Sequence, residues 1–165
     1  MEHLLPKAKK IRLVISDIDG VWTDGGMYYS SRGEELKKFN TRDGMGVELL
    51  RRKNIEVAVI TGENTAIIKR RKEKLGLKLV FLGIQDKKTK VEEIIALLEL
   101  SSEEVAYIGD DINDLDAAKI CGFTATVADG MQALKLSVDY ICQKEGGQGA
   151  FREFAEFILA AQGCL

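Results

Sequence analysis

The chain has 165 residues, of which 45% are hydrophobic and 30% are charged, and its formal net charge is -2. This length accommodates one domain with a full core and is too short for two large ones. The small net charge lacks the basic excess of a nucleic-acid or anionic-membrane binder, and no run of about 18 apolar residues predicts a membrane span. We therefore expect a single domain over 1–165 with no nucleic-acid or membrane partner.

Cysteine and histidine residues narrow the possible chemistry. Cys121, Cys142 and Cys164 are odd in number and widely spaced, so they indicate neither a disulfide framework nor a zinc cluster. The first residues contain too short an apolar stretch for a signal peptide, and a reducing cytoplasm is the expected compartment. The only histidine is His3, near the N-terminus, which argues against histidine-based catalysis. Catalysis must then use carboxylates, Lys, Thr or Ser.

Short apolar runs rich in β-branched residues predict buried parallel strands, because each run ends at a polar or glycine-containing break. They cover residues 11–18, 55–61, 78–83, 105–110 and 123–129. Segments with apolar residues three and four positions apart predict helices. These cover residues 44–53, 65–76, 90–100, 114–122 and 130–139. The alternation predicts a doubly wound, Rossmann-like α/β fold with a parallel sheet.

One segment interrupts this alternation. Residues 27–43, with the sequence MYYSSRGEELKKFNTRD, contain a turn-like SSRG and predict a β-hairpin inserted after the first strand, at about 25–40. The gaps between the other elements are short, so a lid domain of ordinary size has no room. The expected fold is a capless sheet with a hairpin insert and a C-terminal tail at about 145–165.

Polar residues follow four of the predicted strands, where doubly wound sheets bind their ligands. They are Asp17 with Asp19, Thr61, Asp86 with Lys87, and Asp110 with Asp111. Like charges placed this close repel, so the acidic cluster costs stability unless a cation or a reaction uses it. Asp17, Asp19 and Asp110 offer the oxygen ligands that Mg²⁺ prefers, whereas zinc would require His or Cys ligands.

The same residues suit phosphoryl transfer. Asp17 can attack phosphorus, because a metal ion and a nearby lysine offset the repulsion between carboxylate and phosphoryl group. Asp19 lies two residues on in extended chain and projects to the same side, where it can protonate the leaving oxygen and later activate water. The Thr61 hydroxyl can donate to a phosphoryl oxygen, and Lys87 can supply positive charge.

Each residue also has an ordinary structural explanation. An Asp at the end of a strand is usually a turn or helix-cap residue. The segment GDDINDLD at 109–116 is typical of a helix N-terminus with Asp111 or Asn113 as the cap. A cap explains one acid after a buried strand, however, and leaves the second of two adjacent acids unexplained.

At this point the residues resemble a known family. DIDGVWTDG at 17–25 is similar to the first motif of the haloacid dehalogenase superfamily. Thr61 in VITGEN, Lys87 in GIQDKKTK and the segment IGDDINDL at 108–115 resemble its second, third and fourth motifs, in family order. The resemblance covers nearly the whole chain.

This resemblance implies a role for each site residue. Asp17 would be the nucleophile and Asp19 the acid–base group. The implied Mg²⁺ ligands are Asp17, the backbone carbonyl of Asp19, and Asp110. Thr61 and Lys87 would bind phosphoryl oxygens, with Asp114 orienting Lys87.

The short chain, the hairpin and the ending GGQGAFREFAEFILAAQG resemble the capless 3-deoxy-2-ulosonate phosphate phosphatases, which include the 3-deoxy-D-manno-octulosonate 8-phosphate phosphatases of lipopolysaccharide biosynthesis. In those enzymes the hairpins build a central barrel in a tetramer, and a neighbouring protomer helps to close each active site. The resemblance therefore implies a homotetramer. The alternative for GGQGA is a flexible loop before a C-terminal helix.

One departure bears on the substrate. The octulosonate enzymes usually carry a basic residue after the second-motif TG or SG, whereas this chain has Glu63, with Lys74 eleven residues later, a pair that resembles the nonulosonate 9-phosphate phosphatases. Glu63 can accept hydrogen bonds from a sugar hydroxyl or amine, and Lys74 or Arg71 can pair with the 2-keto acid carboxylate. The alternative is a solvated helix face, because IKRRKEK is rich in charge. The nine-carbon substrate is favoured over the eight-carbon one.

Other functions are open at this stage. A phosphoacceptor receiver domain also places Asp, acidic metal ligands, Thr and Lys on a doubly wound sheet, but its acceptor follows the acidic pair on a later strand. Here the candidate acceptor Asp17 precedes its partner Asp19, which supplies the acid–base group of a hydrolase. A phosphatase of another small sugar phosphate is a further alternative.

Overall fold

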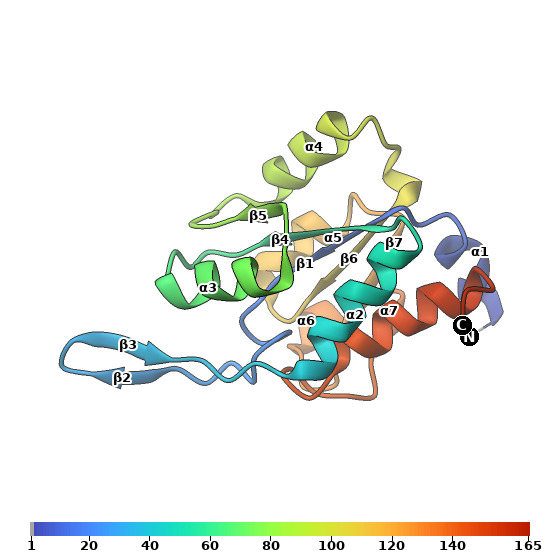
Figure 1. Cartoon of the computed structure of the whole chain (residues 1–165). Helices are drawn as coiled ribbons and strands as arrows, with labels where there is room; N and C mark the ends of the chain where they lie inside the picture. The colour runs from blue at the N-terminus through green and yellow to red at the C-terminus, as the bar shows by residue number, and fades with distance from the viewer. Residues whose placement is uncertain (1) are drawn as a thin grey trace.

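The computed structural model describes residues 2–165, and its centre is a six-stranded sheet with the order β5-β4-β1-β6-β7-β8 (Figure 1). All neighbouring strands in this sheet run parallel. The strands are β1 (Leu13–Ser16), β4 (Glu56–Ile60), β5 (Leu79–Phe81), β6 (Val105–Gly109), β7 (Phe123–Thr126) and β8 (Tyr140–Ile141). The chain runs from β1 to one edge and returns to the other side of β1 with β6. The carboxyl ends of the central strands therefore form the expected binding crevice.

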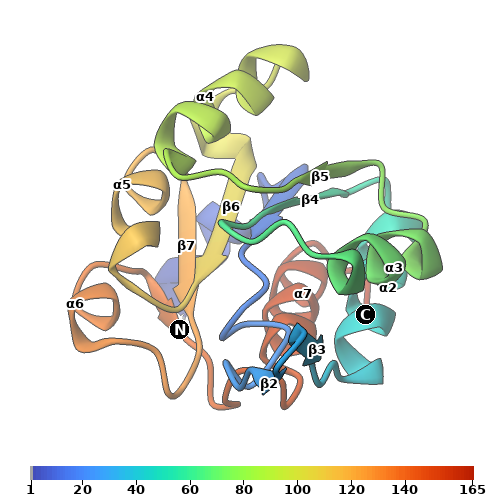
Figure 2. The same ribbon diagram turned by 90° about the vertical axis from the view of Figure 1, so that its left-hand side faces the viewer.

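Helices cover both faces of the sheet. They are α1 (Leu5–Ala8), α2 (Thr41–Arg52), α3 (Ala66–Leu75), α4 (Lys87–Leu97), α5 (Leu115–Ala118), α6 (Gln132–Lys135) and α7 (Ala150–Ala161), with short 3₁₀ turns at Glu2–Leu4, Ser102–Glu104 and Ile112–Asp114. Figure 2 shows α4, α5 and α6 on one side of the sheet and α2, α3 and α7 on the other. This layering confirms the predicted doubly wound fold. None of the helices described in 2–165 is long and apolar enough to cross a membrane.

The central strand shows why its sequence is apolar without interruption. Leu13 and Ile15 belong to the core beneath α4, α5 and α6, whereas Val14 belongs to the core beneath α1, α2 and α7. A strand buried on both faces has no position for a solvated side chain. The first carboxylate, Asp17, therefore follows directly where the strand ends.

The structure differs from the sequence-based expectation near β7. The helices predicted at 114–122 and 130–139 are reduced to α5 and α6, of four residues each, and β8 is an additional strand. Asp139 explains the second difference, because its carboxylate accepts hydrogen bonds from the N–H and the hydroxyl of Thr124 at 3.1 Å each. These contacts draw the chain beside β7, where it continues as the sixth strand.

The predicted hairpin is confirmed as β2 (Tyr28–Ser30) and β3 (Gly33–Leu36), which form a separate antiparallel sheet. Gly33 pairs with Ser30 across the turn and has φ +112°, a conformation that glycine adopts without strain. The hairpin extends away from the main body, as Figure 1 shows at the left. Its large apolar side chains are exposed: Met27 45%, Tyr28 51%, Tyr29 67% and Leu36 64%.

The C-terminal tail contributes to the core. Phe151 and Phe154 on α7 are fully buried, and their rings lie 4.9 Å from Trp22 and 5.2 Å from Phe123, measured between centroids. Aromatic side chains of this size bury the largest apolar areas in a core. The helix that ends the tail is therefore an integral layer of the fold.

Candidate active site

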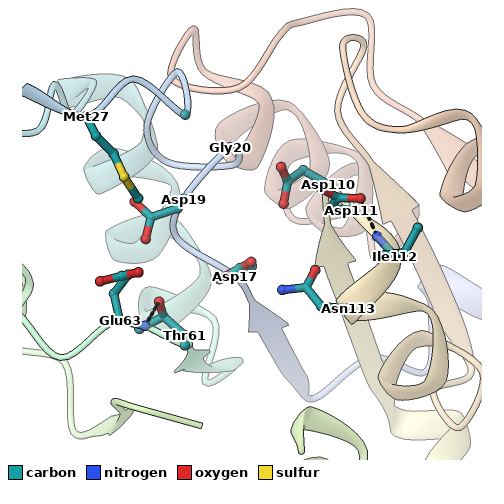
Figure 3. A pocket seen from close by; sticks show the side chains of 12 residues that line it. Asp17, Asp19, Gly20, Met27, Thr61, Glu63, Asp110, Asp111, Ile112 and Asn113 are labelled. Atoms are coloured by element: carbon teal, nitrogen blue, oxygen red, sulfur yellow. Dashed lines mark hydrogen bonds between the residues drawn. The ribbon is translucent and has the colours of Figure 1, made fainter. Parts of the chain in front are cut away.

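The carboxyl ends of β1, β4 and β6 surround a cavity of ≈ 370 Å³ (Figure 3). Among the residues predicted from the sequence, those that line it are Asp17, Asp19, Thr61, Glu63 and Asp110. They come from three separate strand ends, which the parallel sheet brings to one edge. Asp17 lies between the group of Thr61 and Glu63 and the group that includes Asp110 (Figure 3).

Asp17 is the most deeply placed carboxylate of this cavity. Its side chain is 6% exposed, its Oδ1 accepts the N–H of Ile18 at 2.7 Å, and its Oδ2 accepts the Lys87 ammonium at 2.6 Å. Burial and the negative charge of Asp114 raise the pKa of Asp17 to about 7, although Lys87 opposes the shift. A buried carboxylate with a raised pKa and a paired lysine, located in a cavity, is typical of functional sites. The pair therefore marks Asp17 as a candidate catalytic residue.

Lys87 begins α4 and is buried between two carboxylates. Its Nζ also donates to Asp114 Oδ1 at 2.7 Å. Burial acts to lower the pKa of Lys87, but the charges of Asp17 and Asp114 outweigh it and raise the pKa above its usual value. Lys87 is therefore a positively charged group beside the candidate nucleophile.

Asp114 is fully occupied by its neighbours. Its Oδ1 accepts the Tyr107 hydroxyl at 2.6 Å in addition to Lys87, and its Oδ2 accepts the N–H groups of Asp110 at 3.0 Å and Asp111 at 3.3 Å. Asp114 thus connects α4, β6 and the loop after β6. Tyr107 was missed by the sequence reasoning, although a tyrosine inside a buried strand signals that its hydroxyl needs a partner.

The residues present fit a divalent cation. Oxygens of Asp17, Asp110 and Asp114 lie within 4.8 Å of one another, and within residues 2–165 no group donates a hydrogen bond to the Asp110 carboxylate. Burial and the charges of Asp17 and Asp114 raise the pKa of Asp110 to about 8. Lys87 offsets only part of three negative charges, so a hard cation with oxygen ligands would relieve the remaining repulsion.

Glycine at position 20 keeps this space open. Gly20 has φ +83°, and a Cβ added there would lie 2.0 Å from Asp110 Oδ2. A larger residue would therefore strain the backbone and displace the carboxylate.

Asp19 is held by a lysine that the sequence analysis did not single out. Its Oδ1 accepts Lys37 Nζ at 2.6 Å, and the same ammonium lies 3.0 Å from Glu34 Oε1 on the hairpin. Burial acts to lower the pKa of Lys37, but the hydrogen bond to Asp19 and the neighbouring Glu34 carboxylate outweigh this and raise the pKa. No sequence pattern predicts this role for Lys37, because the lysine pair at 37–38 resembles an ordinary solvated turn.

Thr61 and Glu63 lie on the side of Asp17 that faces away from Asp110 (Figure 3). The buried Thr61 hydroxyl oxygen accepts the Glu63 N–H at 3.1 Å, which leaves the hydroxyl proton available to a ligand. The Glu63 carboxylate faces the cavity (Figure 3).

Arg71 and Lys74 do not line this cavity. The Arg71 guanidinium donates to the backbone oxygen of Asn40 at 3.1 Å and lies 5.1 Å from the centroid of the Phe39 ring. Lys74 lines a separate depression with Gly44 and other residues of α2 and α3. Contact of either residue with a sugar acid therefore stays a prediction.

The glycines of the tail pack against the loop that follows β1 in the same chain. The Gly147 N–H donates to the Val21 oxygen at 3.0 Å, and a Cβ at Gly146 would lie 2.0 Å from the Gly20 oxygen. These close approaches require glycine and support the loop that carries Asp19.

Comparison with known proteins identifies the family. Residues 42–122 match the haloacid dehalogenase-like hydrolases. A 3-deoxy-D-manno-octulosonate 8-phosphate phosphatase from Haemophilus influenzae is 43% identical over 157 residues, which cover 95% of this chain and 87% of that protein. This chain belongs to the haloacid dehalogenase-like hydrolases. The resemblance inferred from the four motifs is confirmed, and the protein is a phosphatase.

Solved structures agree over nearly the whole chain. The 3-deoxy-D-manno-octulosonate 8-phosphate phosphatase from Yersinia pestis is 40% identical with a TM-score of 0.95, covering 98% of this chain and 88% of its own. The enzyme from Moraxella catarrhalis, solved with a magnesium ion, phosphate and KDO, is 39% identical with a TM-score of 0.95, covering 99% of this chain and 94% of its own.

The repulsion between the carboxylates predicts a dependence of stability on pH and metal. Asp17 and Asp110 have pKa values of about 7 and about 8, above the value of about 3.9 in an unfolded chain. The folded protein therefore binds more protons, and their contribution to the free energy of unfolding falls as pH rises from about 4 to about 8. A bound cation favours the ionised carboxylates. We expect Mg²⁺ to raise the melting temperature more at about pH 8 than at about pH 5.5.

Differential scanning fluorimetry with and without Mg²⁺ measures this shift. Asp110→Asn should reduce it, whereas Asp116→Asn, which changes an exposed acid on α5, should leave it unchanged. An equal Mg²⁺ shift at both pH values in the unsubstituted protein would contradict the prediction.

Proposed function

We propose that this phosphatase hydrolyses a 3-deoxy-2-ulosonate phosphate through an aspartyl-phosphate on Asp17, with Mg²⁺ as its cofactor. The observation that carries the proposal is the buried contact of 2.6 Å between Asp17 Oδ2 and Lys87, at the base of a cavity lined by further acids. A receiver domain also forms an aspartyl-phosphate, but the acid two residues after the acceptor favours hydrolysis.

The proposed reaction has two steps. In the first, a carboxylate oxygen of Asp17 bonds to phosphorus, the bond from phosphorus to the sugar oxygen breaks, and Asp19 gives a proton to that oxygen. In the second, Asp19 takes a proton from water, the water oxygen bonds to phosphorus, and the bond to Asp17 breaks. Thr61 and Lys87 hold the phosphoryl oxygens. Bound Mg²⁺, held by Asp17, the Asp19 carbonyl and Asp110, supplies charge neutralisation and orientation of the phosphoryl group.

Replacement of the nucleophile tests this mechanism. Asp17→Asn keeps the shape of the side chain but removes its nucleophilic charge, so we expect phosphate release to fall by about 10³-fold or more. Excess chelator should abolish activity of the unsubstituted enzyme. Asp116→Asn serves as the matched control on an exposed acid. Near-normal turnover by a folded Asp17→Asn protein would rule out the aspartyl-phosphate.

Octulosonate 8-phosphate is the first substrate proposed, because relatives named for it are similar over nearly the whole chain. The nine-carbon nonulosonate 9-phosphate, favoured by the sequence, is a second candidate, because Glu63 lines the cavity. Lys74 lies outside the cavity of its own protomer, so it supports this candidate only by reaching a neighbour's site.

The ratio of kcat/KM for the two sugars distinguishes the candidates. If Glu63 binds a substituent that the shorter sugar lacks, Glu63→Ala should cost about 1–3 kcal/mol of transition-state binding for the longer sugar and less for the shorter one. Glu73→Ala, on the exposed face of α3, is the matched control. Preference of the unsubstituted enzyme for the octulosonate, with equal losses for both sugars in Glu63→Ala, would exclude the nine-carbon candidate.

A cytoplasmic homotetramer is proposed as the working form. The exposed apolar side chains of the hairpin support assembly. Tyr29 and Leu36 on a projecting sheet would be buried, with a gain in hydrophobic free energy, only by contact with another chain. A four-chain complex would also explain how a capless site excludes water.

Solution mass tests the assembly. We expect the unsubstituted protein to sediment as four chains and Leu36→Asp, which places a charge on the hairpin, to sediment as smaller species. Leu97→Asp changes a leucine of similar exposure, 68%, on α4 and should keep the unsubstituted mass. A monomeric unsubstituted protein with full activity would contradict the proposal.

A further inference from the structure

The ammonium group of Lys37 is buried between two carboxylates at the base of the hairpin. Its side chain is 0% exposed, and its Nζ lies 2.6 Å from Asp19 Oδ1 and 3.0 Å from Glu34 Oε1, whose side chain is 7% exposed. Burying a lysine is costly unless its charge is paired. A buried lysine at the edge of the active site therefore needs an explanation beyond the solubility of a surface turn.

Attachment of the hairpin does not require Lys37. Thr23 pairs with Phe39 as an isolated antiparallel bridge, and the Asn40 side chain donates to the Gly147 oxygen at 3.1 Å. Lys38, the next residue in the chain, pairs with Asp24 at 3.3 Å on the exposed surface. These contacts hold the base of the hairpin to the body, and Lys37 takes part in none of them.

The contact of Lys37 instead anchors the Asp19 side chain. Oδ1 accepts the lysine, and Oδ2 is buried and has no hydrogen-bond partner among the residues described. Asp19 lines the cavity that contains Asp17. A carboxylate anchored through one oxygen is held in one orientation, and an acid–base group needs a fixed orientation to transfer a proton to a bound substrate.

We propose that Lys37 is a positioning residue for Asp19, and that Glu34 holds Lys37 from the hairpin side. The base of the hairpin would then orient the acid–base group of the reaction. This inference rests on the proposed role of Asp19 as the acid that protonates the leaving oxygen.

The leaving group provides a readout that a purely structural role would not change. An aliphatic alcohol leaves slowly without a proton, whereas p-nitrophenolate leaves as a stable anion. The parameter kcat/KM reports the steps up to release of the leaving group, before the common aspartyl-phosphate is hydrolysed. A misplaced Asp19 should therefore harm aliphatic phosphates selectively.

The experiment measures kcat/KM for octulosonate 8-phosphate, or for the best aliphatic phosphomonoester of the unsubstituted enzyme, and for p-nitrophenyl phosphate. We expect Lys37→Met to lower the aliphatic value by about 10- to 100-fold and the p-nitrophenyl value by less than about 3-fold. Lys37→Arg, which keeps the cation, should recover part of the loss. Lys38→Met is the matched control and should change neither value.

Several outcomes overturn the inference. Equal losses for both substrates in Lys37→Met would mean that the lysine only maintains the fold, and unchanged values would mean that Asp19 needs no tether. If Lys37→Met does not fold, Glu34→Gln carries the test, because loss of the second carboxylate should produce a smaller loss with the same selectivity. A non-selective effect of Glu34→Gln would overturn the inference.

Asp19→Asn distinguishes failure of this inference from failure of the proposed function. A selective aliphatic loss in Asp19→Asn without one in Lys37→Met rejects the tether alone. An equal loss for both substrates in Asp19→Asn rejects the acid role of Asp19 and the inference that rests on it.

Discussion

The ammonium group of Lys87 is buried and forms ion pairs with Asp17 at 2.6 Å and Asp114 at 2.7 Å. The other groups of the site are arranged around these two ion pairs. Removing one partner of a buried ion pair costs about 3–5 kcal/mol, because the remaining charge is left uncompensated. Asp114 also binds Tyr107 and the N–H groups that begin the loop of Asp110. The candidate nucleophile, its lysine and the candidate metal ligand are therefore positioned by one network.

This network contains fewer positive than negative groups. One lysine serves the three acids Asp17, Asp110 and Asp114, and burial raises the pKa values of Asp17 and Asp110. Repulsion between the ionised carboxylates opposes folding, and a bound cation would relieve it. Asp19 is paired with a separate lysine, Lys37, which comes from the hairpin and lies outside the network of Lys87.

The sequence predicted the strand ends well because a strand buried on both faces is apolar until it ends. Asp17 after β1, Thr61 after β4 and Asp110 after β6 were placed at one edge by the parallel topology alone. Prediction was weaker for β8, where the hydrogen bonds that Thr124 donates to Asp139 override the local helical pattern. Such contacts join residues 15 positions apart and leave no periodic signal.

By itself, the sequence determined the fold class, the hairpin and the acids, lysine and threonine of the candidate site, because each depends on local order along the chain. Only the tertiary structure decided which charges meet. It joined Lys37 to Asp19, turned Arg71 toward Asn40, kept Lys74 out of the cavity, and set Gly146 against Gly20. These contacts depend on how the hairpin, α3 and the tail pack against the sheet. Long side chains from separate elements can form many different pairs, and packing alone selects among them.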